Sequence, residues 1–494
     1  MCGIGGAIGD EGIAYVVRNF LGEVQDRGQD TAGIYTIDNA GLEHQLKNDG
    51  LVAEVFNGHL DKLPGPVAVG HTRYKTIGGS GVINAQPFSA ETKNSRFVLC
   101  ISENGHIQNY PQLREQLETK GYWFNSTNDA EVIVKTLAHY LGKEGASEFP
   151  KAMFSAVGKT IDSLKGAYTC VTAVYDRMTK THYLVAFADP RNIRPGVWGL
   201  KEGSYAVASE SIALEEGKYR QIHDIKPGEC IIFNTGAESK LVRPRKRKHC
   251  AFEWAYFAQA LSTMQGRDIN DFRYRSGKAL AQEHADLAER VDCVVPVPFT
   301  PIPTAIGVAD AWDVPLKYAI AKRRSNPKRT FIMPDQETRE REAEAAFRVI
   351  RSVVRGKRLA IVEDSTVRGT NCKVYGRRLR EAGASFIALL SAYPRIINTC
   401  DKGIDMSTLD QLIAHNRTDA EIAKKTGFDE KRYISPDNFL YVLSQQDHHH
   451  VEPLVKEGLF NQSVLENELT PSDFCTSCFT GEDPTANDTG GLVE

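Results

Sequence analysis

The chain has 494 residues, of which 41% are hydrophobic and 25% charged, a composition typical of a soluble globular protein with two or three domains. Its net charge of −3 argues against a nucleic-acid partner, because a surface that follows phosphates normally carries a basic excess. No apolar run is long enough to span a membrane, the N-terminus lacks a secretion signal, and the ten cysteines are too dispersed for a secreted disulfide scaffold. We therefore expect a cytoplasmic protein with no membrane partner.

The chain opens with Met1-Cys2-Gly3, so removal of the initiator methionine exposes a cysteine at the N-terminus. The α-amine of Cys2, with a reference pKa near 8, can then act as general base for its own thiol. Met-Cys starts are commonly accidental, but four polar motifs follow in order. They are Gln25-Asp-Arg-Gly-Gln-Asp30, Gly70-His-Thr-Arg-Tyr-Lys-Thr76, Glu103-Asn-Gly-His-Ile-Gln-Asn109 and Asn128-Asp-Ala-Glu131.

This order of motifs resembles the N-terminal-nucleophile glutamine amidotransferases. The resemblance covers residues 1–242 and implies an α-β-β-α sandwich. By motif, Cys2 attacks the glutamine amide and Arg27 orients the N-terminal end. Asn104 and Gly105 supply the oxyanion hole, which stabilises the charge that develops on the amide oxygen. The positions that correspond to glutamine-binding residues are Arg73, Thr76 and Asp129.

Two positions in this half depart from the family pattern. Asp26 and Glu103 stand where the family usually has His. A negative charge at Glu103, next to the oxyanion hole, would oppose the developing charge, so we expect slow turnover.

A basic linker, residues 243–249, separates the halves of the chain. We interpret it as a solvated connector, since no further basic cluster extends it into a nucleic-acid patch. We expect a second domain over residues 250–420, a helical segment over 421–481 and a disordered polar tail over 482–494.

The second half is best interpreted from the stretch that begins at Lys357. Leu359 to Val362 form a short apolar run, as expected for a strand that is buried on both faces of a parallel sheet. Two acids, a small-residue loop and a helical pattern follow, and the apolar run from Phe386 closes a β-α-β unit. The loop N–H groups and the helix N-terminus can hold a phosphate, and the acids can bind ribose hydroxyls. The alternative is an ordinary strand and turn whose acids cap the helix.

This stretch resembles the phosphoribosyl pyrophosphate (PRPP) motif of phosphoribosyltransferases. The resemblance extends to Cys250-Ala-Phe-Glu253, Val294-Val-Pro-Val-Pro298 and Gly403-Ile-Asp405, and it implies a type I phosphoribosyltransferase domain with a parallel sheet. It also implies that Mg²⁺ is bound at Glu363 and Asp364. The implied PRPP-binding residues are Glu363, Asp364, Ser365, Thr366, Val367, Arg368, Gly369 and Thr370.

Both halves in this order resemble the glutamine PRPP amidotransferases, which make 5-phosphoribosylamine, glutamate and pyrophosphate in the first step of purine biosynthesis. The resemblance further implies a homotetramer inhibited by purine nucleotides. Gln259, Phe299 and Ser325 depart from the family pattern near the transferase site. These departures leave a second hypothesis open, a paralogue that binds PRPP or a nucleotide as a sensor or transfers ammonia to another acceptor.

Four cysteines match the positions at which one branch of the family binds a [4Fe–4S] cluster: Cys250, Cys400, Cys475 and Cys478. A structural zinc ion is the alternative, since four thiolates also suit Zn²⁺. The remaining cysteines beyond Cys2 lie in apolar or helical surroundings and are expected to be inert core residues.

Overall fold

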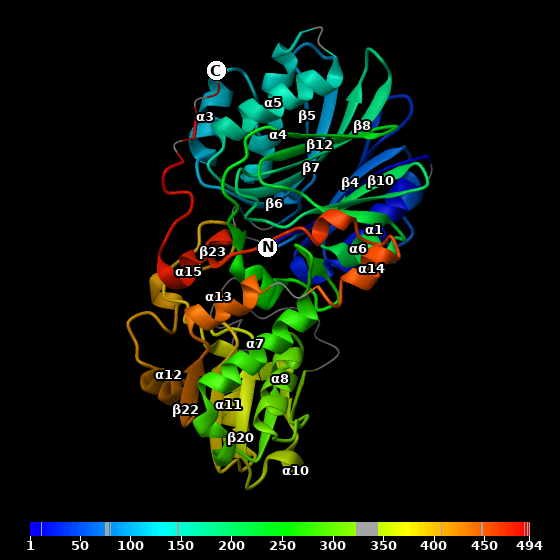
Figure 1. The fold of residues 1–494 in the computed structure, drawn as a ribbon. Coiled ribbons are helices and arrows are strands. Elements are labelled where there is room, and N and C mark those ends of the chain that lie inside the picture. Colours follow the sequence, from blue (N-terminus) through cyan, green and yellow to red (C-terminus); the bar gives the residue numbers. More distant parts are fainter. Residues whose placement is uncertain are drawn as a thin grey trace.

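The computed structural model describes residues 1–10, 12–74, 79, 81–145, 148–322, 344–406, 408–445, 448–488, 490, 491 and 493. Its two halves lie one above the other, with the N-terminal half at the top of Figure 1. The N-terminal half contains two antiparallel sheets, and the second half contains one parallel sheet.

The first sheet has seven strands, and its edges are formed by β11 and β3. In spatial order the strands are β11 (Arg220–Asp224), β9 (Val197–Lys201), β10 (Ser204–Ala208), β1 (Gly3–Ile8), β4 (Val67–Arg73), β2 (Thr31–Ile37) and β3 (Glu43–Asp49). β1 is paired on both sides, with β10 and with β4. Cys2, the candidate nucleophile, therefore lies directly before a central strand of the sheet.

The second sheet has six strands and stacks on the first. Its order is β13 (Ala237–Leu241), β12 (Glu229–Phe233), β8 (Thr181–Ala188), β7 (Gly166–Asp176), β6 (Phe97–Ile107) and β5 (Phe88–Glu91). Apolar side chains of both sheets, such as Ile4, Val69, Val98 and Val171, form the core between them.

Helices cover the two outer faces of the stacked sheets. α1 (Ile13–Glu23) and α6 (Ser211–Glu216) cover the first sheet, while α4 (Asp129–Lys143) and α5 (Phe149–Ser163) cover the second (Figure 1). The layers are helix, sheet, sheet and helix, so the predicted α-β-β-α sandwich is confirmed.

The second half is built on a four-stranded parallel sheet with the order β17 (Cys293–Pro296), β20 (Arg358–Glu363), β21 (Phe386–Ser391) and β22 (Glu430–Tyr433). Ala360 and Val362 belong to the core on the side of α7 (Ile269–Glu283) and α8 (Ile302–Trp312). Leu359 and Ile361 face the opposite side, where α11 (Thr370–Glu381) packs. Both faces are covered, which explains the uninterrupted apolar run and confirms the parallel sheet.

The C-terminal segment contacts both halves. β22, preceded by α12 (Asp419–Thr426), completes the parallel sheet, so the sheet extends past the boundary that we expected at residue 420. After α13 (Pro436–Ser444), the chain returns to the first half through a parallel bridge between Ile222 and Phe460. The smaller elements are α2 (Val52–Val55), α3 (Tyr110–Thr119), α10 (Arg351–Val354), α14 (Glu452–Lys456), α15 (Ser477–Thr480), β14 (His249–Cys250), β15 (Thr263–Met264), β16 (Arg267–Asp268), β18 (Ile320–Lys322), β19 (Phe347–Val349) and β23 (Phe474–Cys475).

The basic linker and the tail pack against each other. Arg191 and Arg245 form ion pairs with Asp488, and Arg247 lies 3.4 Å from Asp473. Val493 is buried. In its described residues the tail, for which we expected disorder, therefore packs on the N-terminal half, and the three linker arginines, Arg243, Arg245 and Arg247, have carboxylate partners.

The close approach of α7 and α8 generates the first prediction. A Cβ atom at Gly277 would lie 2.0 Å from the carbonyl oxygen of Thr304, in the backbone of the facing helix. Gly277→Ala should therefore destabilise the protein by roughly 1–3 kcal/mol, as overpacking does, and lower the midpoint of thermal unfolding.

Gly22→Ala is the matched control, because Gly22 is also helical but a Cβ there would meet no atom within 4 Å. This control should be neutral or stabilise the protein by about 0.5–1 kcal/mol. Equal midpoints for the two variants would contradict the close helix contact.

Candidate active sites

Cys2 lies at the start of β1, and only 6% of it is exposed. Its backbone nitrogen donates a hydrogen bond to Oδ1 of Asn104 (3.0 Å), and its Sγ lies 3.5 Å from the carbonyl oxygen of Tyr74. Burial raises the pKa of the Cys2 thiol and lowers that of the Met1 amine to about 5. The thiol therefore needs a nearby base to become a nucleophile.

Arg27 holds the backbone of Cys2 in place through a hydrogen bond to its carbonyl oxygen. Its Nε donates to the carbonyl oxygen of Cys2 (3.0 Å), and its two terminal nitrogens pair with Glu210 (2.7 Å) and Glu253 (2.9 Å). All three side chains are at most 1% exposed. Sequence analysis assigned an orienting role to Arg27 but missed both glutamates.

Three of the expected glutamine-site residues come together around Cys2. Asn104 is on β6, and its Nδ2 is buried without a hydrogen-bond partner among the described residues, as a donor for an oxyanion must be. Arg73 is the last residue of β4, and its positive charge acts to lower the pKa of the Cys2 thiol, against the effect of burial. Asp129 begins α4 and accepts hydrogen bonds from the backbone nitrogen of Ile107 (2.9 Å). Thr76 lies outside the described residues.

Gly105 cannot be replaced without moving the sheet. A Cβ at this position would lie 1.9 Å from the carbonyl oxygen of Ala167 on β7. The glycine therefore permits the close pairing of β6 with β7. This pairing positions β6, which carries Asn104 and Gly105 and is called the oxyanion strand below.

Glu103 is a buried residue of the same strand, β6, directly before Asn104. Burial, and then the charge of Asp129, raise the pKa of Glu103 well above its usual range. Its Oε1 accepts no hydrogen bond from the described residues. The uncharged form is therefore favoured, which reduces the repulsion that we expected between Glu103 and an oxyanion. Slow turnover stays a prediction.

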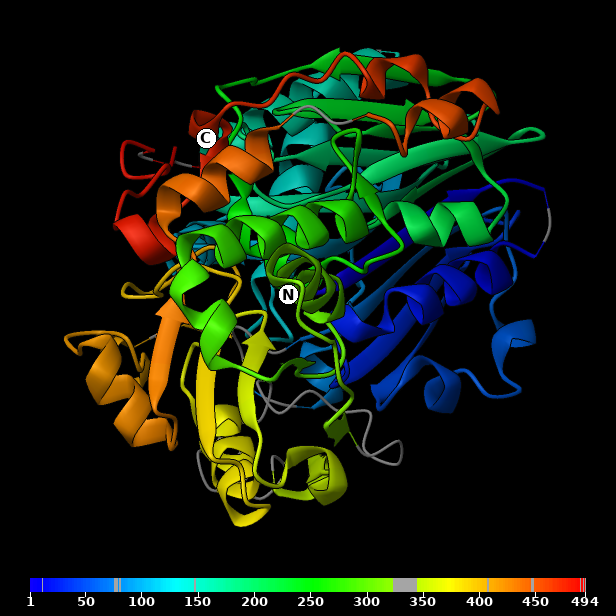
Figure 2. The same cartoon turned by 60° about the horizontal axis from the view of Figure 1, so that its bottom comes forward.

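The PRPP motif begins where β20 ends, and the carboxyl ends of the parallel strands point toward the N-terminal half (Figure 2). Asp364 is half-buried and accepts a hydrogen bond from Oγ of Ser365 (2.9 Å). Gly369 precedes α11 in the left-handed region, with φ 72°, and a Cβ there would lie 2.3 Å from Ile413. The loop and helix thus have the form of a phosphate site.

The two acids of the motif have different surroundings. The carboxylate of Glu363 accepts hydrogen bonds from Nζ of Lys431 (3.0 Å), from the hydroxyl groups of Thr366 and Tyr375, and from Sγ of Cys372 (3.1 Å). These donors occupy both oxygens of a buried side chain. Asp364 is the acid that faces the loop, and we did not foresee this division from the sequence.

A single loop, residues 400–406, contacts both sites. Arg368 of the PRPP motif donates to the backbone oxygen of Asp405 (2.9 Å) and to its carboxylate (3.0 Å). A Cβ at Gly403 would lie 2.9 Å from the carbonyl oxygen of Gly105. The Gly403-Ile-Asp405 motif was a sequence signal for this contact, but its role could not be inferred before the fold was known.

Two of the three departures near the transferase site fall within the described residues. Gln259 donates its side-chain amide to the carbonyl oxygen of Glu23 at the end of α1, so it contacts the N-terminal half. Phe299 is 62% exposed at the loop between β17 and α8. Ser325 lies outside the described residues.

The four cysteines expected at a cluster are brought together from three stretches of the chain. Cys250 and Cys475 are partners in the parallel pair of β14 and β23. The carbonyl oxygen of Cys478 accepts hydrogen bonds from the backbone nitrogens of Ile397 and Asn398 (both 3.0 Å), and this fixes the chain that leads to Cys400. All four thiols are free of disulfides.

The surroundings of these thiols suit a negatively charged group. Arg194 is fully buried, none of its guanidinium nitrogens makes a hydrogen bond among the described residues, and its nearest carboxylate oxygen, on Glu253, is 3.5 Å away. Its pKa is nevertheless raised, because Cys250, Glu253, Cys400 and Cys475 together outweigh the effect of burial. The chemistry of the donor set therefore fits a metal centre bound by thiolates.

The geometry of a single-ion site is not found. Among the described residues, no group of three or more His, Cys, Asp or Glu side chains is arranged to hold one metal ion. Four ligands of one zinc ion would each lie about 2.3 Å from it, which demands closely spaced sulfurs.

In the described ranges, no helix is both long and apolar enough to cross a membrane.

Similar proteins and structures extend over both halves. Residues 59–236 match the family described as the glutamine amidotransferase domain. The amidophosphoribosyltransferase of Methanothermobacter thermautotrophicus is 35% identical over 98% of this chain and 94% of its own length. The amidophosphoribosyltransferase of Bacillus subtilis is 34% identical over the same shares.

Two solved structures are similar in fold and sequence. One, described as the allosteric regulatory enzyme of purine biosynthesis, has a TM-score of 0.82 and 32% identity, covering 99% of this chain and 98% of its own. The other, glutamine PRPP amidotransferase from Bacillus subtilis complexed with ADP and GMP, has a TM-score of 0.80 and 32% identity, covering 98% and 97%. Relatives of this identity span nearly the whole chain, and the protein therefore belongs to the amidophosphoribosyltransferase family.

Proposed function

We propose that the protein hydrolyses glutamine at Cys2 and transfers the ammonia to PRPP, giving 5-phosphoribosylamine, glutamate and pyrophosphate. The observation that carries this proposal is the 400–406 loop, which contacts Arg368 of the PRPP motif and the strand of Gly105 in one chain. An enzyme that hands ammonia from one site to another needs such neighbouring sites.

In the first half-reaction, the α-amine of Cys2, freed by removal of Met1, takes the thiol proton. The sulfur attacks the glutamine amide carbon, and the Nδ2 of Asn104 donates to the developing oxyanion. Arg73 pairs with the substrate α-carboxylate, and Asp129 pairs with its α-ammonium. The α-ammonium of Cys2 then returns its proton to the amide nitrogen, the C–N bond breaks, and ammonia leaves a thioester on Cys2. Water attacks the thioester carbonyl and releases glutamate, and the sulfur regains a proton.

In the second half-reaction, the ammonia nitrogen forms a bond to C1 of PRPP while the bond from C1 to pyrophosphate breaks. The nitrogen then loses a proton. The backbone N–H groups of residues 365–370 and the start of α11 hold the 5′-phosphate, and Asp364 accepts hydrogen bonds from the ribose hydroxyls. Asp364 would also hold Mg²⁺, which neutralises charge on the pyrophosphate.

Cys250, Cys400, Cys475 and Cys478 would hold a [4Fe–4S] cluster with a structural role. It would join the linker, the 400–406 loop and the C-terminal segment, which supply its ligands. Arg194 would lie beside it as the compensating cation.

Regulation and assembly follow the relatives. Since the similar Bacillus subtilis structure is described as complexed with ADP and GMP, we extend purine-nucleotide inhibition and a homo-oligomeric state to this chain. The ten cysteines form no disulfide, which suits the reducing cytoplasm.

The nucleophile is tested by Cys2→Ala. Glutamine-dependent product formation should fall to background, because the sulfur that attacks the amide is lost. Transfer from added ammonia should persist, because the PRPP site is untouched. Pyrophosphate release, measured with each nitrogen source, separates the two activities, and equal loss of both would contradict two separable sites.

The PRPP site is tested by Asp364→Ala. Calorimetry should find PRPP binding weaker by roughly 1.5–3 kcal/mol, the usual loss for a hydrogen bond to a charged group. Glu289→Ala is the matched control, because Glu289 is exposed and its backbone contacts the opposite end of β20. PRPP binding without turnover in the unmodified protein would favour the sensor hypothesis, and absence of binding would exclude the enzyme.

The metal centre is tested by anaerobic purification and metal analysis. The protein should contain about four irons per chain. Cys478→Ser should lose iron, whereas Cys230→Ser, a buried thiol in the core of the sandwich, should keep it. Zinc without iron would instead support the alternative metal.

A further inference from the structure

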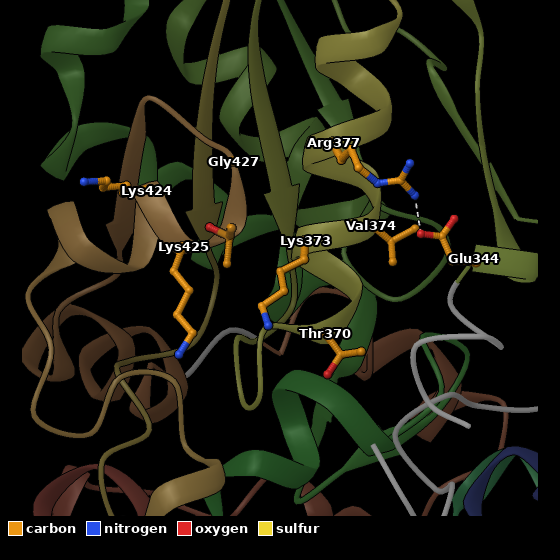
Figure 3. Close-up of a pocket in the computed structure, with 9 residues that line it drawn as sticks. Glu344, Thr370, Lys373, Val374, Arg377, Lys424, Lys425 and Gly427 are labelled. Atoms are coloured by element: carbon orange, nitrogen blue, oxygen red, sulfur yellow. Dashed lines mark hydrogen bonds and ion pairs between the residues drawn. The ribbon is translucent and has the colours of Figure 1, made fainter. Parts of the chain in front are cut away.

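A cavity of about 400 Å³ adjoins the PRPP motif on the outer side of α11. Its walls are Glu344, residues of α11 from Thr370 to Arg377, and the end of α12 with Gly427. It shares Thr370 with the motif, but none of residues 363–369 lines it. The cavity therefore extends from Thr370, at the end of the substrate loop, toward Lys424 and Lys425 at the end of α12 (Figure 3).

The charge of this cavity is strongly one-sided. The side-chain ammonium groups of three lining residues, Lys373, Lys424 and Lys425, form no hydrogen bond or ion pair with any described residue. The pKa of Lys425 is lowered by the charge of Arg417, by burial and by Lys373. Positive charges thus repel one another here, and an anion would relieve that repulsion.

The nearby carboxylates do not balance these lysines. Glu344 pairs with Arg377 and Arg378, and Asp429 pairs with Arg380. Glu421 accepts hydrogen bonds from the backbone and hydroxyl group of Thr418 as a helix cap. Each acid therefore has its own partner among the described residues.

The directions of the side chains locate the charge. In Figure 3 the side chains of Lys373 and Lys425 point the same way, toward the level of Thr370, while Lys424 points away from them. Lys373 belongs to the first turn of α11, and Lys425 belongs to the end of α12, so the two lysines line the cavity from different helices. Together they define the candidate anion position, while the start of α11 itself belongs to the PRPP loop.

We propose that this cavity binds a phosphate-bearing small molecule, with its phosphate between Lys373 and Lys425, at a site separate from that of PRPP. Its volume lies within the range of small-molecule sites and exceeds what a bare phosphate needs. A sugar phosphate is the class of ligand that fits both the volume and the charge.

The test uses the full chain with Mg²⁺ and a saturating carbocyclic PRPP analogue that cannot react. A first calorimetric titration with the analogue tests the proposed substrate site. A second titration, with inorganic phosphate or ribose 5-phosphate, tests the cavity. We expect one further site per chain, tighter binding of ribose 5-phosphate than of phosphate, and weakening by added salt.

The variants assign the site. Lys373→Gln with Lys425→Gln should weaken ribose 5-phosphate binding by roughly 10-fold or more, since two charge-assisted contacts are lost. Lys424→Gln removes one lysine charge from the edge of the cavity and should change ribose 5-phosphate binding less than about 2-fold. Lys373→Arg with Lys425→Arg should largely retain binding, which separates lost charge from disturbed folding.

Two outcomes would overturn the proposal. Absence of a second site once the analogue is bound would assign the lysines to the approach of PRPP itself. Equal weakening by the Lys424→Gln control would mean an adventitious ion only. Binding of the PRPP analogue, measured first, remains a separate result in both cases.

Discussion

The structure depends on a buried group of charges beneath the nucleophile. Arg27 lies between Glu210 and Glu253, and none of the three side chains is more than 1% exposed. Burial disfavours the charged form of Arg27, but the two carboxylates outweigh it, and the pKa of Arg27 is raised. Removing one member of such a group leaves an uncompensated buried charge, which typically costs about 3–5 kcal/mol. The group also joins the two halves, because Glu253 comes from the second half while Arg27 and Glu210 come from the first.

The 400–406 loop supplies a second connection with a different physical basis. Gln108, just beyond the oxyanion strand, donates to Asp401 (2.8 Å), and Arg368 holds Asp405 at the other end of the loop. Between them Gly403 has φ 95° and lies against the backbone of Gly105, where no side chain fits. The PRPP motif and the oxyanion strand are therefore connected through this loop by packed backbone as well as by hydrogen bonds to charged groups.

Much of the fold could be predicted from local sequence, because apolar runs and turn residues report on their own surroundings. The buried strand from Leu359 to Val362 is one example. The role of Glu363 shows the limit. Side chains alternate along a strand, so Glu363 follows Ile361 to the face covered by α11, where Tyr375 and Cys372 donate to it. This alternation was available from the sequence, but Lys431, on a strand 68 residues later, was not.

The cysteines required the fold, since Cys250 and Cys478 are more than two hundred residues apart. The pairing of β14 with β23 brings Cys250 to Cys475, and backbone hydrogen bonds to Cys478 position the chain before Cys400. Burial raises the pKa of Cys250 to about 12, so its bare thiol would stay neutral. Arg194 would then remain a buried cation whose nearest carboxylate, Glu253, is already shared with Arg27. Thiolates bound to a metal would supply the negative charge that this guanidinium lacks. Charge balance therefore supports a thiolate-bound centre beside Arg194, and it links that centre through Glu253 to the arginine that holds the carbonyl of Cys2.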